Sequence, residues 1–265
     1  MALKLGIIGE PNSGKSFSRT YLTKGEEVFI IAPSAKATHT KDSSGKPLQR
    51  LNIYNDKFPT IESLAAAGKT TIHGVVAKID TIPDYKISGN YVRCRLDSLQ
   101  MYLKFVDKYM PHIKTIIIAD FSHYISAVLS NRAFIQRKAG GEAFQRFWEL
   151  AGDALENVIL SIDELRDDLI VITEYHSEYD EASDNWKIFV PGGKMLIQAF
   201  KLDSYYDYML YTHVKLKESG EVESYNFVTR RFGKYNARCA ELFKDTFIPN
   251  NLQIVLDKMR ESNGI

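Results

Sequence analysis

One motif near the amino terminus constrains the fold of this 265-residue chain more than any other feature. Residues 9–16 read GEPNSGKS and match the pattern G-x-x-x-x-G-K-[ST] at every fixed position. The apolar residues 3–8 before the motif predict a buried strand, and residues 15–22 predict a helix after it. A strand, a glycine-containing loop and a helix in this order indicate a phosphate-binding loop, or P-loop. The alternative is a chance turn rich in Gly and Ser.

The chemistry of this loop follows from its residue types. Glycines let the backbone curl so that successive N–H groups point at a phosphate, and the positive end of the helix adds to that field. Lys15 is expected to reach the β- and γ-phosphates of ATP, and the Ser16 hydroxyl is expected to ligate Mg²⁺. The nucleotide-binding residues predicted from the motif are Gly9, Glu10, Pro11, Asn12, Ser13, Gly14, Lys15, Ser16 and Phe17.

The most hydrophobic predicted strand, residues 115–119, is followed directly by Asp120. A strand of this Walker B type places its terminal carboxylate at the edge of the sheet where ligands bind. The carboxylate then holds the metal ion, usually through a water molecule. Asp120 is therefore predicted as the second metal-binding residue. The alternative is an aspartate that caps a helix after a core strand.

A third polar cluster ends the predicted strand 169–173. Thr173 and His176 are candidates for sensing the γ-phosphate, and Glu174 is a candidate for orienting the attacking water. Asp97, after the predicted strand 91–95, is a further candidate for the catalytic carboxylate. The alternative for the cluster is an ordinary polar loop with an exposed histidine.

Composition limits the class of protein and its partners. The chain has 34 basic and 33 acidic residues, so any contact with nucleic acid requires a local basic patch. Its two cysteines, Cys94 and Cys239, form neither a metal-ligand cluster nor a disulfide framework, which suits a reducing cytoplasm. No apolar run is long enough for a membrane span. We therefore expect a soluble, cytoplasmic protein without a membrane partner.

The type of predicted element changes along the chain. Strands such as residues 28–32 alternate with helical segments, the longest at 141–165, while residues 33–90 predict a loop-rich insertion, with or without a small hairpin. Two hairpins follow: residues 186–190 with 194–198, and residues 208–215 with 223–230. A short helix, residues 250–259, ends the pattern. This order predicts one α/β domain over residues 1–265, with a mostly parallel central sheet flanked by helices and extended by C-terminal antiparallel hairpins.

With these residues placed, the sequence resembles phage-encoded RecA-like ATP-binding proteins, akin to the ATPases found beside phage single-strand annealing systems. The resemblance departs from the family pattern at Arg238, where the family has lysine, and at Asn251, where it has aspartate. Arginine keeps the positive charge but not the geometry of lysine. The matching segments, in chain order, are residues 9–16, 44–47, 89–91, 116–124, 173–177, 193–194, 207–212, 225–229 and 247–252.

The resemblance implies a RecA-like P-loop NTPase core that assembles into rings or filaments, with ATP between subunits. It also implies two partners: single-stranded DNA, and a phage recombination protein or single-strand-binding protein. A cation from one subunit would reach the γ-phosphate held by the next and stabilise the transition state. The candidates for this cation are Arg230, Arg231, Lys234 and Arg238. The alternative for this group is a hairpin edge protected by charge.

In RecA-type proteins the loops after the metal-binding and sensor strands face DNA. Residues 121–140 interleave cations with aromatic residues, as strand-binding loops do, and the DNA-binding candidates there are Arg132, Arg137 and Lys138. The alternative is a solvated helix face. Residues 177–186 are acidic, which argues against phosphate contact at the second loop.

These observations and the resemblance together favour an ATPase of phage DNA recombination or replication that assembles on single-stranded DNA when ATP is bound. One alternative is a nucleotide-gated loader or scaffold that hydrolyses little ATP. Another is a P-loop kinase acting on a small molecule, although the sequence has no clear arginine-rich lid segment for that chemistry.

Overall fold

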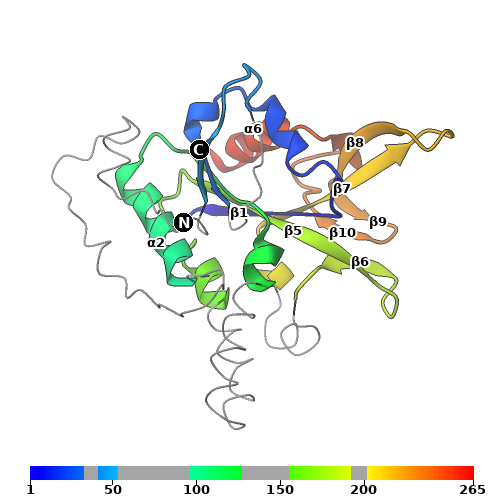
Figure 1. Cartoon of the computed structure of the whole chain (residues 1–265), viewed down its shortest axis with the longest axis horizontal. Coiled ribbons are helices and arrows are strands. Elements are labelled where there is room, and N and C mark those ends of the chain that lie inside the picture. The colour runs from blue at the N-terminus through cyan, green and yellow to red at the C-terminus, as the bar shows by residue number, and fades with distance from the viewer. Residues whose placement is uncertain (33–40, 53–95, 127–154, 192–201) are drawn as a thin grey trace, which may run out of the picture.

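The computed structural model describes residues 1–32, 41–52, 96–126, 155–191 and 202–265 (Figure 1). Within these ranges a mixed β-sheet forms the centre of the molecule. Its main strands are β1 (Leu3–Gly9), β2 (Val28–Ala32), β3 (Gln49–Asn52), β4 (Thr115–Ile118), β5 (Ile170–Asp180), β7 (Tyr208–Leu216), β8 (Val222–Val228) and β11 (Phe247–Pro249). They lie in the order β11-β8-β7-β1-β5-β4-β2-β3.

Three further strands attach to this path. β6 (Asn185–Ile188) pairs with the end of β5, β10 (Tyr235–Arg238) pairs with β7, and β9 (Arg230–Phe232) pairs with β10. The strands from β7 across to β3 pair in parallel, whereas β7 with β8 and β8 with β11 pair antiparallel. The predicted α/β class, with a mostly parallel sheet extended by antiparallel hairpins, is confirmed.

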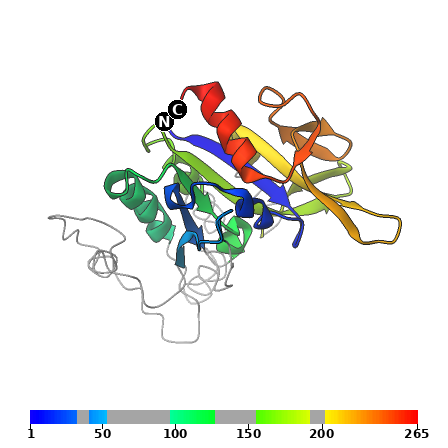
Figure 2. The same cartoon turned by 90° about the horizontal axis from the view of Figure 1, so that it is seen from above.

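The parallel strands are continuous apolar runs because both faces of the sheet are covered. On one face lie α2 (Leu96–Tyr109) and the helical residues 121–126 and 155–160, and on the other lies α6 (Leu252–Asn263) (Figure 2). Successive side chains of a strand point to opposite faces, so each strand contributes to two cores. Ile116 and Ile118 of β4 belong to the α2 core, whereas Ile117 belongs to the α6 core.

The terminal helix α6 has a defined start and end. The Asn251 side chain accepts hydrogen bonds from the backbone of Gln253 and Ile254, as an N-cap residue does. Gly264 ends the helix in the left-handed conformation, at a φ of 69°. Asparagine is among the residues preferred at the N-cap, so Asn251 suits this position.

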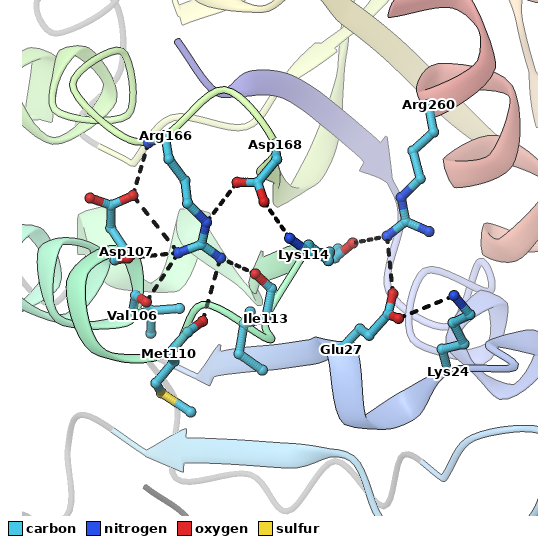
Figure 3. Close-up of polar contacts among 11 residues, drawn as sticks. Lys24, Glu27, Val106, Asp107, Met110, Ile113, Lys114, Arg166, Asp168 and Arg260 are labelled. Atoms are coloured by element: carbon cyan, nitrogen blue, oxygen red, sulfur yellow. Dashed lines mark hydrogen bonds and ion pairs between the residues drawn. The ribbon is translucent and has the colours of Figure 1, made fainter. Parts of the chain in front are cut away.

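The amino ends of β4 and β5 are tied to the end of α2 by Arg166 (Figure 3). Its guanidinium donates to the backbone oxygens of Asp107 and Met110 at 2.7 and 3.4 Å and to a carboxylate oxygen of Asp168 at 2.6 Å. Asp168 also accepts from Lys114. Every charge in this network is paired with a neighbour, and the network lies at the edge of the sheet opposite to the P-loop. We therefore interpret it as structural.

Several predicted elements differ from those in the structure. The helix after the P-loop is the 3₁₀ segment η1 (Phe17–Tyr21), and the described part of the predicted helix 141–165 ends at residue 160. β5 extends to Asp180 and pairs with β6 through a turn at residues 181–184, which the sequence did not predict. β6 corresponds to the first strand of the predicted hairpin 186–190 with 194–198, and residues 192–193 between those strands lie outside the described ranges. The other predicted strand of that hairpin, 194–198, lies outside the described residues, as does 91–95.

The region predicted as a loop-rich insertion contributes a strand to the sheet. β3 pairs in parallel with β2 at the edge, and an isolated bridge joins Lys41 to Pro47 around a tight turn. The rest of residues 33–90 lies outside the described ranges. None of the helices in the described part of the chain is long and apolar enough to cross a membrane.

Candidate functional site

The P-loop joins the carboxyl end of β1 to η1 and turns through two residues with left-handed backbones. Asn12 has a φ of 62° and Gly14 a φ of 98°. Ser13 donates its backbone N–H to the oxygen of Glu10 at 3.3 Å, and Ser18 donates its own to the oxygen of Gly14 at 3.0 Å. Left-handed residues in a tight loop gather backbone N–H groups around one concavity, which is the arrangement that binds anions. The backbone geometry fits a phosphate.

Gly9 lies against Thr212 of β7. A Cβ atom added at Gly9 would lie 1.7 Å from Oγ1 of Thr212 and 2.6 Å from Oγ of Ser13. These two hydroxyl oxygens are 2.5 Å apart and share a hydrogen bond. Thr212 therefore holds Ser13 in place from the neighbouring strand, which requires a residue without a side chain at position 9.

The Lys15 ammonium is folded back onto its own loop. Nζ donates to the backbone oxygens of Gly9 at 2.5 Å and Glu10 at 2.7 Å, and only 7% of the residue is exposed. Burial lowers the pKa of Lys15, and the nearby carboxylates of Glu174 and Asp120 oppose that shift. The lysine thus lies between the phosphate loop and two acids, where it can exchange its carbonyl partners for phosphate oxygens.

Asp120 and His176 meet at the carboxyl edge of the sheet. Asp120 follows β4 with a φ of 53° and precedes the helical residues 121–126. Nε2 of His176 lies 3.4 Å from Oδ1 of Asp120. The register explains this meeting, because β5 pairs with β4 at Thr173 and with β1 at His176, opposite Gly9. The structure thus brings Asp120, Thr173, Glu174 and His176 to the same edge as the P-loop.

Glu174 is held by a residue that the sequence analysis did not single out. Arg19 of η1 donates Nε to Oε1 of Glu174 at 3.0 Å and Nη2 to Oε2, which makes a two-pronged ion pair. Arg19 is 0% exposed and Glu174 2%. The sequence shows an arginine four residues after the P-loop lysine. It does not show that this arginine pairs with Glu174, which is 155 residues away.

Two other unpredicted residues touch Gly14. A Cβ atom at that position would lie 2.9 Å from the Tyr225 ring and 3.2 Å from the side-chain nitrogen of Asn250. Tyr225 belongs to β8 and Asn250 follows β11, so the antiparallel part of the sheet contacts the phosphate loop directly. Asn250 is 3% exposed, and neither polar atom of its amide has a hydrogen-bond partner within the described ranges.

The predicted metal ligands are placed at this same edge. Ser16 is half-buried at the start of η1, and Asp120 ends the strand two positions away in the sheet. Among the described residues no group of three or more His, Cys, Asp or Glu could hold a metal on its own. A magnesium ion bound with a nucleotide takes phosphate oxygens and water for most of its ligands, so one hydroxyl and one carboxylate suffice.

The four predicted trans-acting cations have different environments. Arg230 donates to the oxygen of Phe243 at 2.5 Å, and Arg238 donates to the oxygen of Tyr206 at 3.2 Å. Lys234 pairs with Asp184 at 3.0 Å. Arg231 is exposed on β9 and makes no side-chain hydrogen bond or ion pair within the described part of the chain.

The remaining predicted residues are not placed by the structure. Arg132, Arg137 and Lys138 lie outside the described residues. Asp97 lies in the first turn of α2, and its side chain is also outside what the structure describes. No protein-family model matches the chain, and no curated protein matches it.

Proposed function

We propose that this protein binds ATP with Mg²⁺ on residues 9–16 and hydrolyses it. The observation that carries this proposal is the position of Lys15, a buried ammonium on a left-handed loop at the end of a parallel strand, with Glu174 and Asp120 close enough to oppose the effect of burial on its pKa. Burying an ammonium is costly unless it has strong partners. A buried lysine beside two acids is therefore not expected in a chance turn.

The residues of the site have different roles in hydrolysis. The loop N–H groups and Lys15 bind the phosphates and stabilise the negative charge that develops on the γ-phosphoryl oxygens. Ser16 and Asp120 would hold Mg²⁺, which neutralises charge on the phosphate oxygens. His176, with Nε2 at 3.4 Å from Oδ1 of Asp120, is the neighbour that can orient that carboxylate. Water attacks the γ-phosphorus in line with the departing phosphate oxygen.

The wider proposal is a RecA-like ATPase of phage DNA recombination or replication that assembles on single-stranded DNA. Two observations support it beside the resemblance of the sequence. β5 lies between the P-loop strand and the strand of Asp120, so a sensor strand contacts both. Arg231 is exposed and without a partner in the described ranges, which suits a cation that acts on a neighbouring subunit.

The test is ATP turnover by the full chain and by Lys15→Ala, with and without single-stranded DNA, together with particle size under the same conditions. The proposal expects turnover that requires Lys15, and particles that grow when ATP and DNA are both present. Turnover that requires Lys15 but ignores DNA, with no DNA binding at moderate salt, would refute the DNA part alone.

One observation favours a second function, a nucleotide-gated loader or scaffold with little hydrolysis. Both carboxylate oxygens of Glu174 accept from Arg19, so the acid is engaged in a structural pair. An acid held in this way is not available to orient water. Tight ATP binding with turnover no faster than that of Lys15→Ala would favour this second function over the first.

A further inference from the structure

Three aromatic side chains gather where the P-loop ends, and we call them the ring cluster. Phe17 follows Ser16 directly, and Tyr21 lies at the other end of η1, with ring centroids 5.7 Å apart and planes at 89°. The Tyr225 ring of β8 lies 5.5 Å from Phe17 at a tilt of 44°. These three residues come from two segments that are far apart in the sequence.

The ring cluster is open to solvent. Phe17 is 46% exposed and Tyr21 41%, although the fold buries most of its large apolar residues. Isolated exposed aromatic residues are ordinary, but several in contact at one place are typical of a binding surface. Their flat faces offer contact area and stacking without a loss of buried hydrogen bonds.

The ring cluster is continuous with the phosphate loop. The Tyr225 ring packs against Gly14, where an added Cβ would lie 2.9 Å from the ring. Phe17 begins η1 at the end of the loop that holds Lys15 and Ser16. A nucleoside triphosphate with its phosphates on that loop extends its ribose and base outward from it, and the rings lie at this exit.

Asn250 supplies an independent observation at the same place. Its amide nitrogen and oxygen are buried, lie beside Gly14, and have no hydrogen-bond partner within the described part of the chain. Nearly all buried polar groups in native folds are paired, so an unpaired amide calls for a physical reason. A ligand entering beside Gly14 would supply the missing partners.

We propose that the ring cluster is the base-binding part of the nucleotide site. The aromatic base of the nucleoside triphosphate stacks on the Phe17 ring and makes an edge-to-face contact with the Tyr21 ring, which stands at 89° to Phe17. Asn250 makes a polar contact with the ligand at Gly14. This inference rests on the proposed function, because the phosphate loop determines where the base lies. The ligand is therefore a nucleotide with an aromatic base, and not a free polyphosphate.

Comparing ATP with inorganic triphosphate tests the inference, because the two share the phosphate contacts and differ in the base. Each is titrated by calorimetry into the full chain and into Phe17→Ala, Tyr21→Ala and Phe17→Trp. Loss of one stacking ring is expected to weaken ATP binding about 5- to 150-fold, and to leave the affinity for triphosphate unchanged. Phe17→Trp, which keeps a flat ring, should retain the affinity for ATP.

Phe232→Ala is the matched control, since Phe232 is 49% exposed but lies on β9, away from the ring cluster. It should bind both ligands as the unaltered chain does. The inference is overturned if Phe17→Ala weakens both ligands equally or neither, or if the unaltered chain binds ATP no more tightly than triphosphate. If the unaltered chain binds neither ligand, the proposed function fails as well, and the two failures are thereby distinguished.

Discussion

Arg19 and Glu174 form a buried ion pair that joins η1, the segment after the P-loop, to β5. Nε of Arg19 lies 3.0 Å from Oε1 of Glu174, and Nη2 donates to the other carboxylate oxygen. Both residues act on the Lys15 ammonium: burial lowers the pKa of Lys15, Glu174 opposes that shift, and Arg19 adds to it. The electrostatic environment of the lysine therefore depends on a pairing of residues from β5 and η1.

Breaking this pair is expected to destabilise the fold strongly. Arg19→Leu leaves a carboxylate buried without its partner, which costs about 3–5 kcal/mol in the free energy of unfolding. The double variant Arg19→Leu with Glu174→Leu removes both charges, so it should be more stable than the single variant. Denaturant unfolding of Arg19→Leu, Glu174→Leu, the double variant and the unaltered chain forms a double-mutant cycle that measures the coupling.

The exposed pair of Lys215 and Glu223, 2.8 Å apart, serves as the control for this cycle. Lys215→Ala should change the free energy of unfolding by less than about 1 kcal/mol, because water screens an exposed pair. An Arg19→Leu variant no less stable than Lys215→Ala would contradict the buried position of the pair.

Gly9→Ala is expected to disrupt the phosphate loop. The added methyl group would overlap with Thr212 and Ser13, so β1 or the loop must shift. The backbone N–H groups of the loop would then no longer be placed to bind a phosphate. Gly6→Ala is the matched control on the same strand, because its added methyl group meets the nearest atoms at an ordinary 3.5 Å. ATP titration should show binding lost in Gly9→Ala and retained in Gly6→Ala, and equal affinities would rule out the crowding at Gly9.

The affinity for nucleotide should fall at a lower pH than it would if Lys15 had the pKa of an ordinary lysine. Burial lowers the pKa of Lys15 from its usual 10.5, despite the opposing carboxylates. Below the lowered pKa the ammonium attracts phosphate, and as the pH rises through that pKa the charge and the affinity are lost. ATP titrations from pH 7 to above pH 10 should show this fall in the unaltered chain and no such fall in Lys15→Ala. A flat profile in both would refute it.

Asp120→Asn should separate metal-dependent turnover from nucleotide binding. The amide keeps the shape of the side chain but loses the charge that attracts Mg²⁺, so turnover should fall about 100- to 1,000-fold. ATP binding without magnesium should be little changed, because Lys15 and the loop remain. Asp257→Asn on the exposed face of α6 is the control and should behave as the unaltered chain. A loss of turnover in both variants would show that Asp120 has no special role.

The sequence predicted the local parts of this structure well. The strand before the P-loop, β2, the β7–β8 hairpin and α6 were predicted because each depends on the pattern of its own residues. That residues 9–16 carry a phosphate site stays a prediction of the motif. The predicted convergence of Lys15, Asp120 and the end of β5 on one edge follows from parallel strands, whose carboxyl ends meet.

The sequence pattern did not predict the contacts that complete the site. Ser13 meets Thr212 across 199 residues of chain, and Gly14 meets Tyr225 and Asn250 through strands that no local pattern assigns to that position. The sequence predicted a helix after the P-loop, and the structure has a 3₁₀ segment, which puts Arg19 inward toward Glu174. Such contacts depend on strand order, which the local patterns of a single sequence do not reveal.

The most direct test of the central claim is the binding of ATP with magnesium to the full chain and to Lys15→Ala. If residues 9–16 form a phosphate loop, the unaltered chain binds ATP in the range of ordinary nucleotide sites, and loss of the ammonium weakens that binding at least tenfold while the fold remains intact by circular dichroism. Equal affinity in the two proteins, or no binding to the unaltered chain, would contradict the account.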